Sequence, residues 1–365
     1  MNRKKFSPLL MSMFAVSLVT GCLPRDSIED VSLIQIVGYD VAKDDEIRGT
    51  VVVPHFSRME QGKGVEEETL TSTAHSTKQI HTKLQSKAAR PITIGTLKVA
   101  LYSAELAEKG IGSVIDSMAR DPRIGRNIYL AITEGNTKEI LDAGISKNET
   151  TGKFISGLIE QNAATNFPRT NLHEFLYTHF GKGMDGYLPY LKLNDRDELA
   201  LDGIAFFNDG KFVYKAPYEK SYTFTLLKEN FKEATQEIEF EKRYIVVESI
   251  GSNVKYIFNG DKDNPAFTIK ITMTGIINDA PTLALELTPP VIKKMEKTIE
   301  KYNEKEAEEM IKKFQEHKID PLGLGSIIDN RVRNLDFKKW KEEQYPEMPI
   351  KVDLKMKILE VGTTS

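Results

Sequence analysis

The sequence of 365 residues contains a single cysteine, Cys22. A lone cysteine excludes an intramolecular disulfide framework and any metal site built from several thiolates. After the first 21 residues, no stretch approaches the roughly 20 consecutive apolar residues that a membrane-spanning helix requires. Neither sign of charge dominates, since the chain has 50 Lys and Arg and 53 Asp and Glu. This balance argues against a strongly basic nucleic-acid binder. Apolar residues make up 40% of the chain, as is ordinary for a folded, water-soluble body.

Motifs that carry catalysis are scarce. His173, Glu174 and His179 have the composition of a zinc-protease helix, but that motif needs its histidines four residues apart and these are six apart. No Gly-x-Ser-x-Gly nucleophile elbow occurs. Neither Gly181-Lys-Gly183 nor Gly323-Leu-Gly325 continues into a nucleotide-binding fingerprint. The sequence therefore predicts a protein that is not an enzyme and that holds no metal or cofactor.

The chain begins with the pattern of a secretory signal. Residues 3–5 are cationic, residues 8–19 are mainly apolar, and the small residues Thr20 and Gly21 stand directly before Cys22. This order is that of a bacterial lipobox, which predicts cleavage between Gly21 and Cys22 and both S-diacylglyceryl and N-acyl modification of the cysteine. An ordinary signal peptide followed by a chance cysteine is the alternative.

A lipid on Cys22 would hold the body at a membrane, because two or more acyl chains give stable anchoring. We therefore expect the chain on the outer face of a bacterial cytoplasmic membrane. Loss of the three cationic residues 3–5 takes the formal charge from −3 to −6. A mildly acidic body does not favour broad adhesion to an anionic membrane. The acyl groups on Cys22 are therefore expected to provide the attachment.

Strand and helix patterns alternate along the rest of the chain, which predicts an α+β (mixed α/β) fold of several domains with mainly antiparallel or mixed sheets. We expect a signal peptide at 1–21, a tether at 22–30, an N-terminal α+β domain of one lobe or two at 31–196, and a C-terminal α+β domain at 197–365. The boundary is placed at Arg196, in a charged stretch.

Local signals suggest individual elements. Ser76 is expected to cap a helix, residues 106–120 to form one helix, and Asp209-Gly210 to close a hairpin, because its turn needs positive φ. Strands are expected at 239–249 and 253–258, with Gly251 in the turn between them. Further expected elements are a hairpin of 31–38 with 48–54, strands at 97–102, 128–133, 267–277 and 350–358, and helices at 137–142, 154–164, 172–180, 290–317 and 324–337.

The helix at 290–317 carries an apolar stripe on one face, with Lys and Glu on the other. Core packing is the favoured interpretation of this stripe and of Trp340, and a partner-docking face is the alternative. The stripe consists of Val291, Met295, Ile299, Tyr302, Met310 and Phe314.

Several segments, in order along the chain, carry a resemblance to a known family. They are Cys22, Arg25-Asp26-Ser27-Ile28-Glu29-Asp30, Arg120-Asp121-Pro122-Arg123-Ile124-Gly125-Arg126-Asn127, Tyr187-Leu188-Pro189, Leu201-Asp202-Gly203-Ile204-Ala205-Phe206-Phe207, and Trp340 with Tyr345-Pro346. Together they resemble the Ger(x)C lipoproteins, the C subunits of spore germinant receptors. The resemblance implies a non-catalytic, multi-domain subunit that works with two integral subunits, A and B, in the spore inner membrane and responds to nutrients.

Two points remain open at this level. We hypothesise that residues 120–127, through Arg123 and Arg126, and one exposed strand edge provide docking surface; a plain helix-to-strand connection stabilised by Asp121 and Pro122 is the alternative. A solute-binding lipoprotein of a transport system is the alternative function, and it predicts two similar lobes around a ligand cleft.

Overall fold

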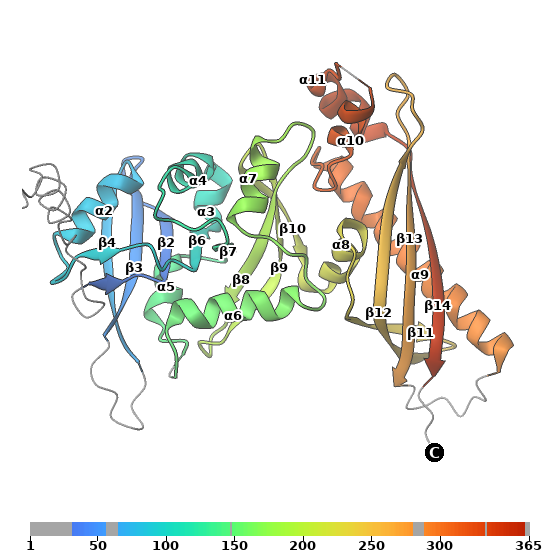
Figure 1. Ribbon diagram of the computed structural model, residues 1–365, viewed down its shortest axis with the longest axis horizontal. Coiled ribbons are helices and arrows are strands. Elements are labelled where there is room, and N and C mark those ends of the chain that lie inside the picture. Colours follow the sequence, from blue (N-terminus) through green and yellow to red (C-terminus); the bar gives the residue numbers. More distant parts are fainter. Residues whose placement is uncertain (1–30, 56–64, 147, 280–287, 333, 362–365) are drawn as a thin grey trace, which may run out of the picture.

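The computed structural model describes residues 31–55, 65–146, 148–279, 288–332 and 334–361. As expected, the fold is mixed α+β. Two main sheets follow one another along the long axis of the molecule, with the end that carries α2 and β4 opposite the C-terminal sheet (Figure 1).

The first sheet has eight strands, in the order β10-β9-β8-β7-β6-β2-β3-β4. Its middle strands β8, β7, β6 and β2 are parallel, and an antiparallel pair of strands extends it on each side. The strands are β2 (Ile36–Val41), β3 (Ile47–His55), β4 (Glu66–Ala74), β6 (Val99–Ser103), β7 (Tyr129–Thr133), β8 (Tyr187–Leu193), β9 (Leu199–Asn208) and β10 (Lys211–Pro217). A short parallel pair, β1 (Ser32–Leu33) with β5 (Ile92–Thr93), lies beside it.

Helices cover both faces of this sheet. One buried cluster joins a sheet face to side chains of α2 (Thr77–Gln85), α3 (Ala104–Lys109), α4 (Gly112–Ala119) and α7 (Leu172–Phe180). The opposite face packs against α5 (Thr137–Asp142) and α6 (Thr151–Ala163). Each face therefore buries its apolar side chains under a helical layer.

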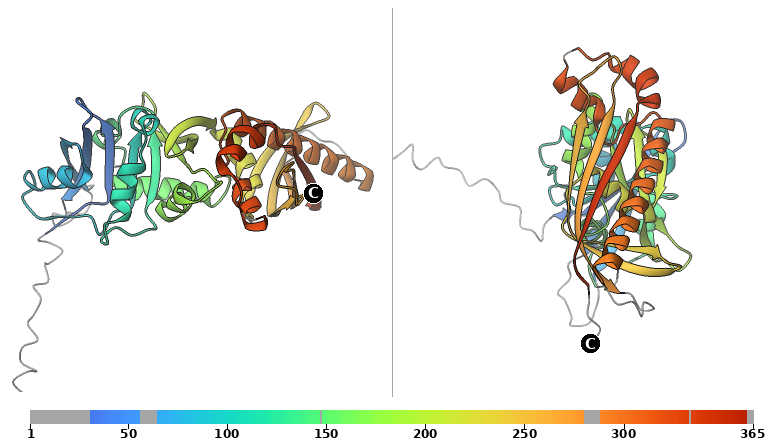
Figure 2. Two further views of the ribbon diagram at one scale, coloured as in Figure 1. Left: turned by 90° about the horizontal axis from the view of Figure 1, so that it is seen from above. Right: turned by 90° about the vertical axis from the view of Figure 1, so that its right-hand side faces the viewer.

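The second sheet has the order β11-β12-β13-β14, with β13 and β14 parallel and the other pairs antiparallel. Its strands are β11 (Ala234–Phe240), β12 (Arg243–Phe258), β13 (Phe267–Asp279) and β14 (Ile350–Val361). The long helix α9 (Pro289–Glu316) crosses one face of it (Figure 2). One continuous core runs from Ile36 in the first sheet to Ile358 in the second, through α8 (Ser221–Lys228) and α9.

Local signals predict several elements correctly. Ser76 accepts a hydrogen bond from the Gln79 amide and begins α2. Asp209 and Gly210 both have positive φ, 50° and 78°, and close the β9–β10 hairpin. The stripe of α9 is buried at Met295, Ile299, Met310 and Phe314, and Trp340 is 1% exposed, so the core interpretation holds for these residues.

Other expectations need correction. Residues 106–120 form two helices, because Gly110 has a φ of 117° and ends α3. Gly251 lies within the continuous strand β12, at a bulge against β13, so the expected turn is absent there. The expected helix at 324–337 is shorter: α10 spans Leu324–Arg331, and the three-residue helix α11 spans Phe337–Lys339. Tyr302 remains 39% exposed.

The first sheet continues past Arg196. Residues 194–198 connect β8 to β9, which pair in an antiparallel hairpin, and the sheet ends only at Pro217. The second sheet begins at Ala234. The division of the chain into 31–196 and 197–365 stays a prediction.

Candidate partner-binding site

An open groove of about 580 Å³ lies near the end of the molecule that carries α2. Helices α2 and α4 line it, and the turn that follows α4 closes one end. This turn contains Arg123, one of the two residues predicted to take part in docking. In Figure 1, α2 and α4 lie over the left half of the first sheet.

The floor and much of the walls of the groove are apolar. Val37, Tyr39 and Val51 of the sheet form part of the floor, and each is less than a tenth exposed. Ile80 and Leu84 enter from α2, because their four-residue spacing places them on the buried face of that helix. An apolar floor with charged side chains at its rim suits the side chains of a protein partner.

Asp121 and Arg123 form a compact charged turn at this rim. The Asp121 carboxylate accepts hydrogen bonds from the Arg123 Nε at 2.9 Å, from its Nη2 at 2.6 Å and from its backbone amide at 3.0 Å. The hydrogen bond from the Arg123 side chain holds the pKa of Asp121 below its usual range. The guanidinium is still about half exposed, so it remains available to a partner while its orientation is set.

His81 lines the same groove from α2. Its Nε2 is buried and has no hydrogen-bond partner among the described residues. Burial, aided by the positive charge of Arg123, lowers the pKa of His81. The imidazole is therefore neutral at pH 7, and it presents a polar atom that a bound group could satisfy.

Arg126 lies in the same connection but does not line the groove. Its guanidinium is exposed and contacts the Ala119 carbonyl oxygen at 3.5 Å. The structure thus places Arg123 at a concave surface and Arg126 beside α4, and their docking role stays a prediction. Cys22, with the cleavage position after Gly21, lies outside the described residues.

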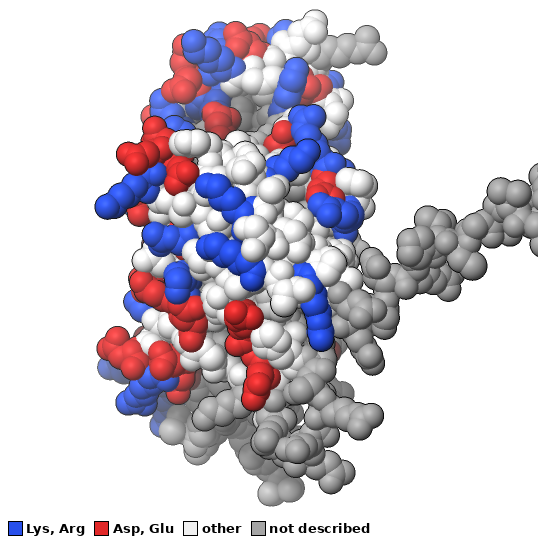
Figure 3. Space-filling view, turned by 90° about the vertical axis from the view of Figure 1, so that its left-hand side faces the viewer, with Lys and Arg blue, Asp and Glu red and all other residues white. Residues whose placement is uncertain are grey.

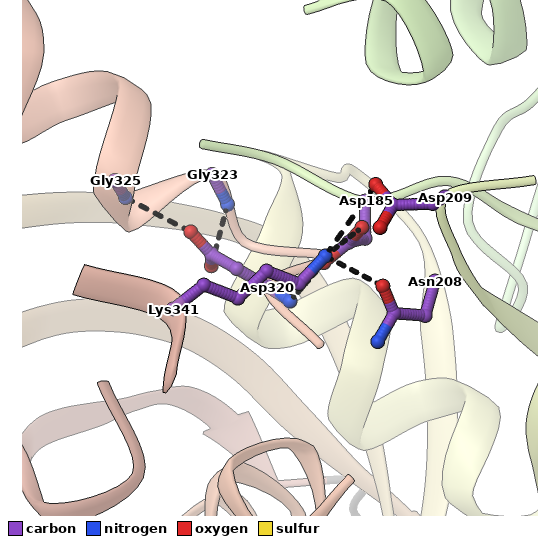
Figure 4. Close-up of polar contacts among 7 residues, drawn as sticks. All are labelled: Asp185, Asn208, Asp209, Asp320, Gly323, Gly325 and Lys341. Carbon is purple, nitrogen blue, oxygen red and sulfur yellow. Dashed lines mark hydrogen bonds and ion pairs between the residues drawn. The ribbon is translucent and has the colours of Figure 1, made fainter. Parts of the chain in front are cut away.

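A second cluster of polar contacts joins the two sheets, and the sequence analysis missed it (Figure 4). Asp185, which precedes β8, accepts a hydrogen bond from the Asp320 amide at 2.8 Å and from Lys341 Nζ at 3.1 Å. Lys341 also donates to Asn208 at 2.7 Å, at the end of β9. The Asp320 carboxylate accepts the amides of Gly323 and Gly325, both at 2.9 Å.

This polar junction consists of Asp185, Asn208, Asp209, Asp320 and Lys341. Asp185 and Asp320 are buried, and burial sets their electrostatics, whereas Asp209 is exposed and lies 3.8 Å from Lys341 Nζ. Burial raises the pKa of Asp320 to about 7, even though two backbone amides favour its charged form. Burial raises the pKa of Asp185 as well, and the ammonium of Lys341 opposes that rise. Close backbone approach is needed here, because a Cβ on Gly183 would lie 2.6 Å from the backbone of Gly325. The arrangement therefore ties the start of β8 and the end of β9 to the segments that follow α9.

Among the described residues, no group of three or more His, Cys, Asp or Glu side chains is placed to hold a metal ion. His179 instead stacks on Phe175 of the same helix, with ring centres 6.1 Å apart, and a Cβ on Gly112 or Gly210 would lie 3.1 Å or 2.9 Å from its ring. In the same part of the chain, no helix is both long and apolar enough to cross a bilayer.

Comparison with known proteins gives matches over almost the whole chain. A family model described as the spore germination protein N-terminal domain matches residues 24–193, and a spore germination B3/GerAC-like C-terminal model matches residues 202–362. The spore germination protein GerQC of Bacillus cereus is 28% identical over 361 residues, which cover 98% of each chain.

More distant relatives agree with this. The spore germination protein KC of Bacillus subtilis (strain 168) is 21% identical, over 99% of this chain and 97% of its own length. The crystal structure of the GerBC protein has a TM-score of 0.59 at 19% identity, and the match covers 91% of this chain and all of that one. This structural similarity supports the mixed α+β fold described above. Nothing in these matches supports the solute-binding alternative, and the eight-stranded and four-stranded sheets are not similar lobes.

Proposed function

The chain belongs to the GerAC-like family of germinant receptor C subunits, and from this premise we propose that it is the lipid-anchored, non-catalytic C subunit of a nutrient germinant receptor. In this proposal, Cys22 carries the lipid, the body lies on the outer face of the spore inner membrane, and integral A and B subunits are its partners.

The observation that carries the proposal is the position of the family match relative to Cys22. The N-terminal model begins at residue 24, two residues after the cysteine, and the C-terminal model ends at residue 362. The residues before the match are a cationic start, an apolar segment and the two small residues Thr20 and Gly21 directly before Cys22. This is the order of a lipoprotein signal. A lipid at this position would leave the matched body intact.

Replacement of Cys22 tests the anchor. We expect Cys22→Ala to move the protein from the membrane fraction of spores to the soluble fraction and to slow nutrient germination, because no acyl chain can then be attached. Mass spectrometry of the wild-type protein should show a processed N-terminus at Cys22 with diacylglyceryl and acyl groups.

Ser12→Ala is the matched control, since it changes a small residue of the signal and leaves the cysteine in place. It should fractionate and germinate like the wild type. A bare Cys22 thiol in the processed protein, or a Cys22→Ala variant that stays with membranes and germinates normally, would rule out lipid anchoring.

The groove beside Arg123 is the surface that we propose for an integral partner. It combines an apolar floor with a half-exposed guanidinium whose orientation Asp121 sets. A tether raises the effective concentration of the body near its membrane partners, so a contact of modest area suffices for assembly.

A further inference from the structure

The segment that contains α2 has positive charge and no acidic residue. Between residues 69 and 104 there are five Lys or Arg residues and no Asp or Glu, in a chain whose acids outnumber its bases overall. The five are Lys78, Lys83, Lys87, Arg90 and Lys98, and each is exposed.

Four of these residues, Lys78, Lys83, Lys87 and Arg90, lie on α2 and the turn after it, and we name them the basic patch. α2 runs back across the end of β4, where the Lys83 ammonium donates to the Thr73 carbonyl at 2.6 Å. In the end view of Figure 3, Lys and Arg side chains spread over the middle of this surface, with Asp and Glu mainly above and below them.

The charge of the basic patch is not neutralised locally. Among the described residues, none of its four side chains forms an ion pair. Two acidic residues of α4 and the turn after it have other partners, since Asp116 pairs with Arg120 and Asp121 pairs with Arg123. Glu67 of β4 accepts hydrogen bonds from Thr151. The patch therefore keeps its positive potential at the surface.

The tether joins the body next to this patch. The Ser32 amide, in β1, donates to the Pro91 carbonyl oxygen at 2.8 Å, directly after Arg90 in the chain. Nine residues, 23–31, separate Ser32 from the lipidation position, so the distance between the two is at most about 35 Å when the segment is fully extended. The basic patch is thus held close to whatever surface carries the lipid.

We propose that the basic patch binds the anionic headgroups of the membrane in which Cys22 is anchored, an inference that rests on the proposed function. The acyl chains on Cys22 already give stable anchoring, and a cluster of basic side chains adds attraction to anionic headgroups that sets which face meets the membrane. The mature chain has a formal net charge of −6, so its overall charge does not attract it to anionic lipid. The patch therefore orients the molecule, with α2 on the membrane and the C-terminal sheet farthest from it (Figure 1).

Vesicle flotation of the mature chain with Cys22→Ser tests this surface without the lipid. We expect binding to phosphatidylcholine vesicles that contain phosphatidylglycerol, none to phosphatidylcholine alone, and loss of binding at high salt. Each basic side chain at an anionic surface contributes about a factor of five. Lys78→Gln, Lys83→Gln and Lys87→Gln together should therefore weaken binding about a hundredfold.

The matched control removes three exposed lysines, Lys351, Lys355 and Lys357, from β14 at the other end of the molecule. It should change vesicle binding by less than about twofold if the patch, rather than overall charge, makes the contact. Equal weakening by both triple variants, or no weakening by the patch variant, would overturn the proposal.

A label placed on α2 reports the contact directly. With Cys22 replaced, the chain has no other thiol, so a polarity-sensitive dye on Gln79→Cys marks a single site in α2. Its emission should shift to the blue on anionic vesicles, whereas the same dye on Lys301→Cys of α9 should not respond. A patch variant that floats normally but no longer recovers the integral subunits would identify a protein docking surface instead. Because the chain tested carries no lipid, these results do not depend on the outcome of the Cys22→Ala test.

Discussion

Asp320 is a buried carboxyl group at the polar junction between the sheets, and its protonation affects stability. Burial raises its pKa from 3.8 to about 7. Between those values the folded protein keeps a proton that the unfolded chain has released, so the free energy of unfolding falls as pH rises. The decrease is about 1.4 kcal/mol per pH unit in that interval. Above about pH 7 the Asp320 carboxyl group is ionised in both the folded and the unfolded protein, so it no longer makes the free energy of unfolding depend on pH.

We therefore expect Asp320→Asn to flatten the pH dependence of stability between about pH 4 and pH 7, because an amide does not titrate there. Urea denaturation of the mature chain with Cys22→Ser, at a series of pH values, measures this. Asp195→Asn, at an exposed position, should show the same dependence of the free energy of unfolding on pH as the wild type. Parallel profiles for Asp320→Asn and the wild type would show that Asp320 does not hold a proton in the folded state.

At the scale of elements, α9 holds the two sheets together through Phe314. This side chain is fully buried, and its ring centre lies 4.9 Å from that of Phe206 in β9 and 5.8 Å from that of Phe224 in α8. Phe314→Ala should lower the free energy of unfolding by about 3–5 kcal/mol, because the cavity cannot collapse between three packed elements. Tyr302→Ala, on the same helix at a 39% exposed position, should cost less than about 1 kcal/mol. Equal losses in urea denaturation would contradict this role.

Elements with a local chemical signal were predictable, and contacts between distant segments were not. Ser76 and the pair Asp209-Gly210 act through their immediate neighbours, so their cap and turn follow from the sequence. Gly251 between two β-rich runs is typical of a turn. Its strand stays continuous because β13 pairs with β12 both before and after Gly251, whereas the pairing with β11 ends at Ser249.

The two candidate sites differ in the same way. The sequence singles out Arg123 through the segment 120–127, and its docking role stays a prediction, whereas the apolar floor behind it comes from strands far away in the sequence. The polar junction has no local signal, because Asp185 and Asp320 are 135 residues apart and meet only when both sheets have formed.

For the whole molecule, the tether and the groove lie toward the same end. Ile92 of β5 pairs with Ser32 of β1, and it also lines the groove. A tether of nine residues therefore keeps the groove within reach of proteins embedded in the membrane. The C-terminal sheet, at the opposite end, is the part of the molecule farthest from that contact (Figure 1).

Charge reversal in the connection between α4 and β7, where Arg123 lines the groove and Arg126 lies beside it, tests whether receptor assembly uses this part of the surface. We expect Arg123→Glu with Arg126→Glu to reduce recovery of the integral subunits about tenfold or more when the chain is purified from detergent-solubilised spore membranes. Recovery should fall because the positive charges of Arg123 and Arg126, which contact the partner in this proposal, are replaced by negative ones. Arg196→Glu with Arg331→Glu, at exposed positions outside the groove, is the matched control and should not alter recovery. Arg123→Glu also breaks the contact with Asp121, so Arg126→Glu alone, which leaves that turn intact, separates docking from folding. Unchanged recovery in both the double variant and Arg126→Glu would exclude this connection from the receptor interface and leave it as a link between α4 and β7.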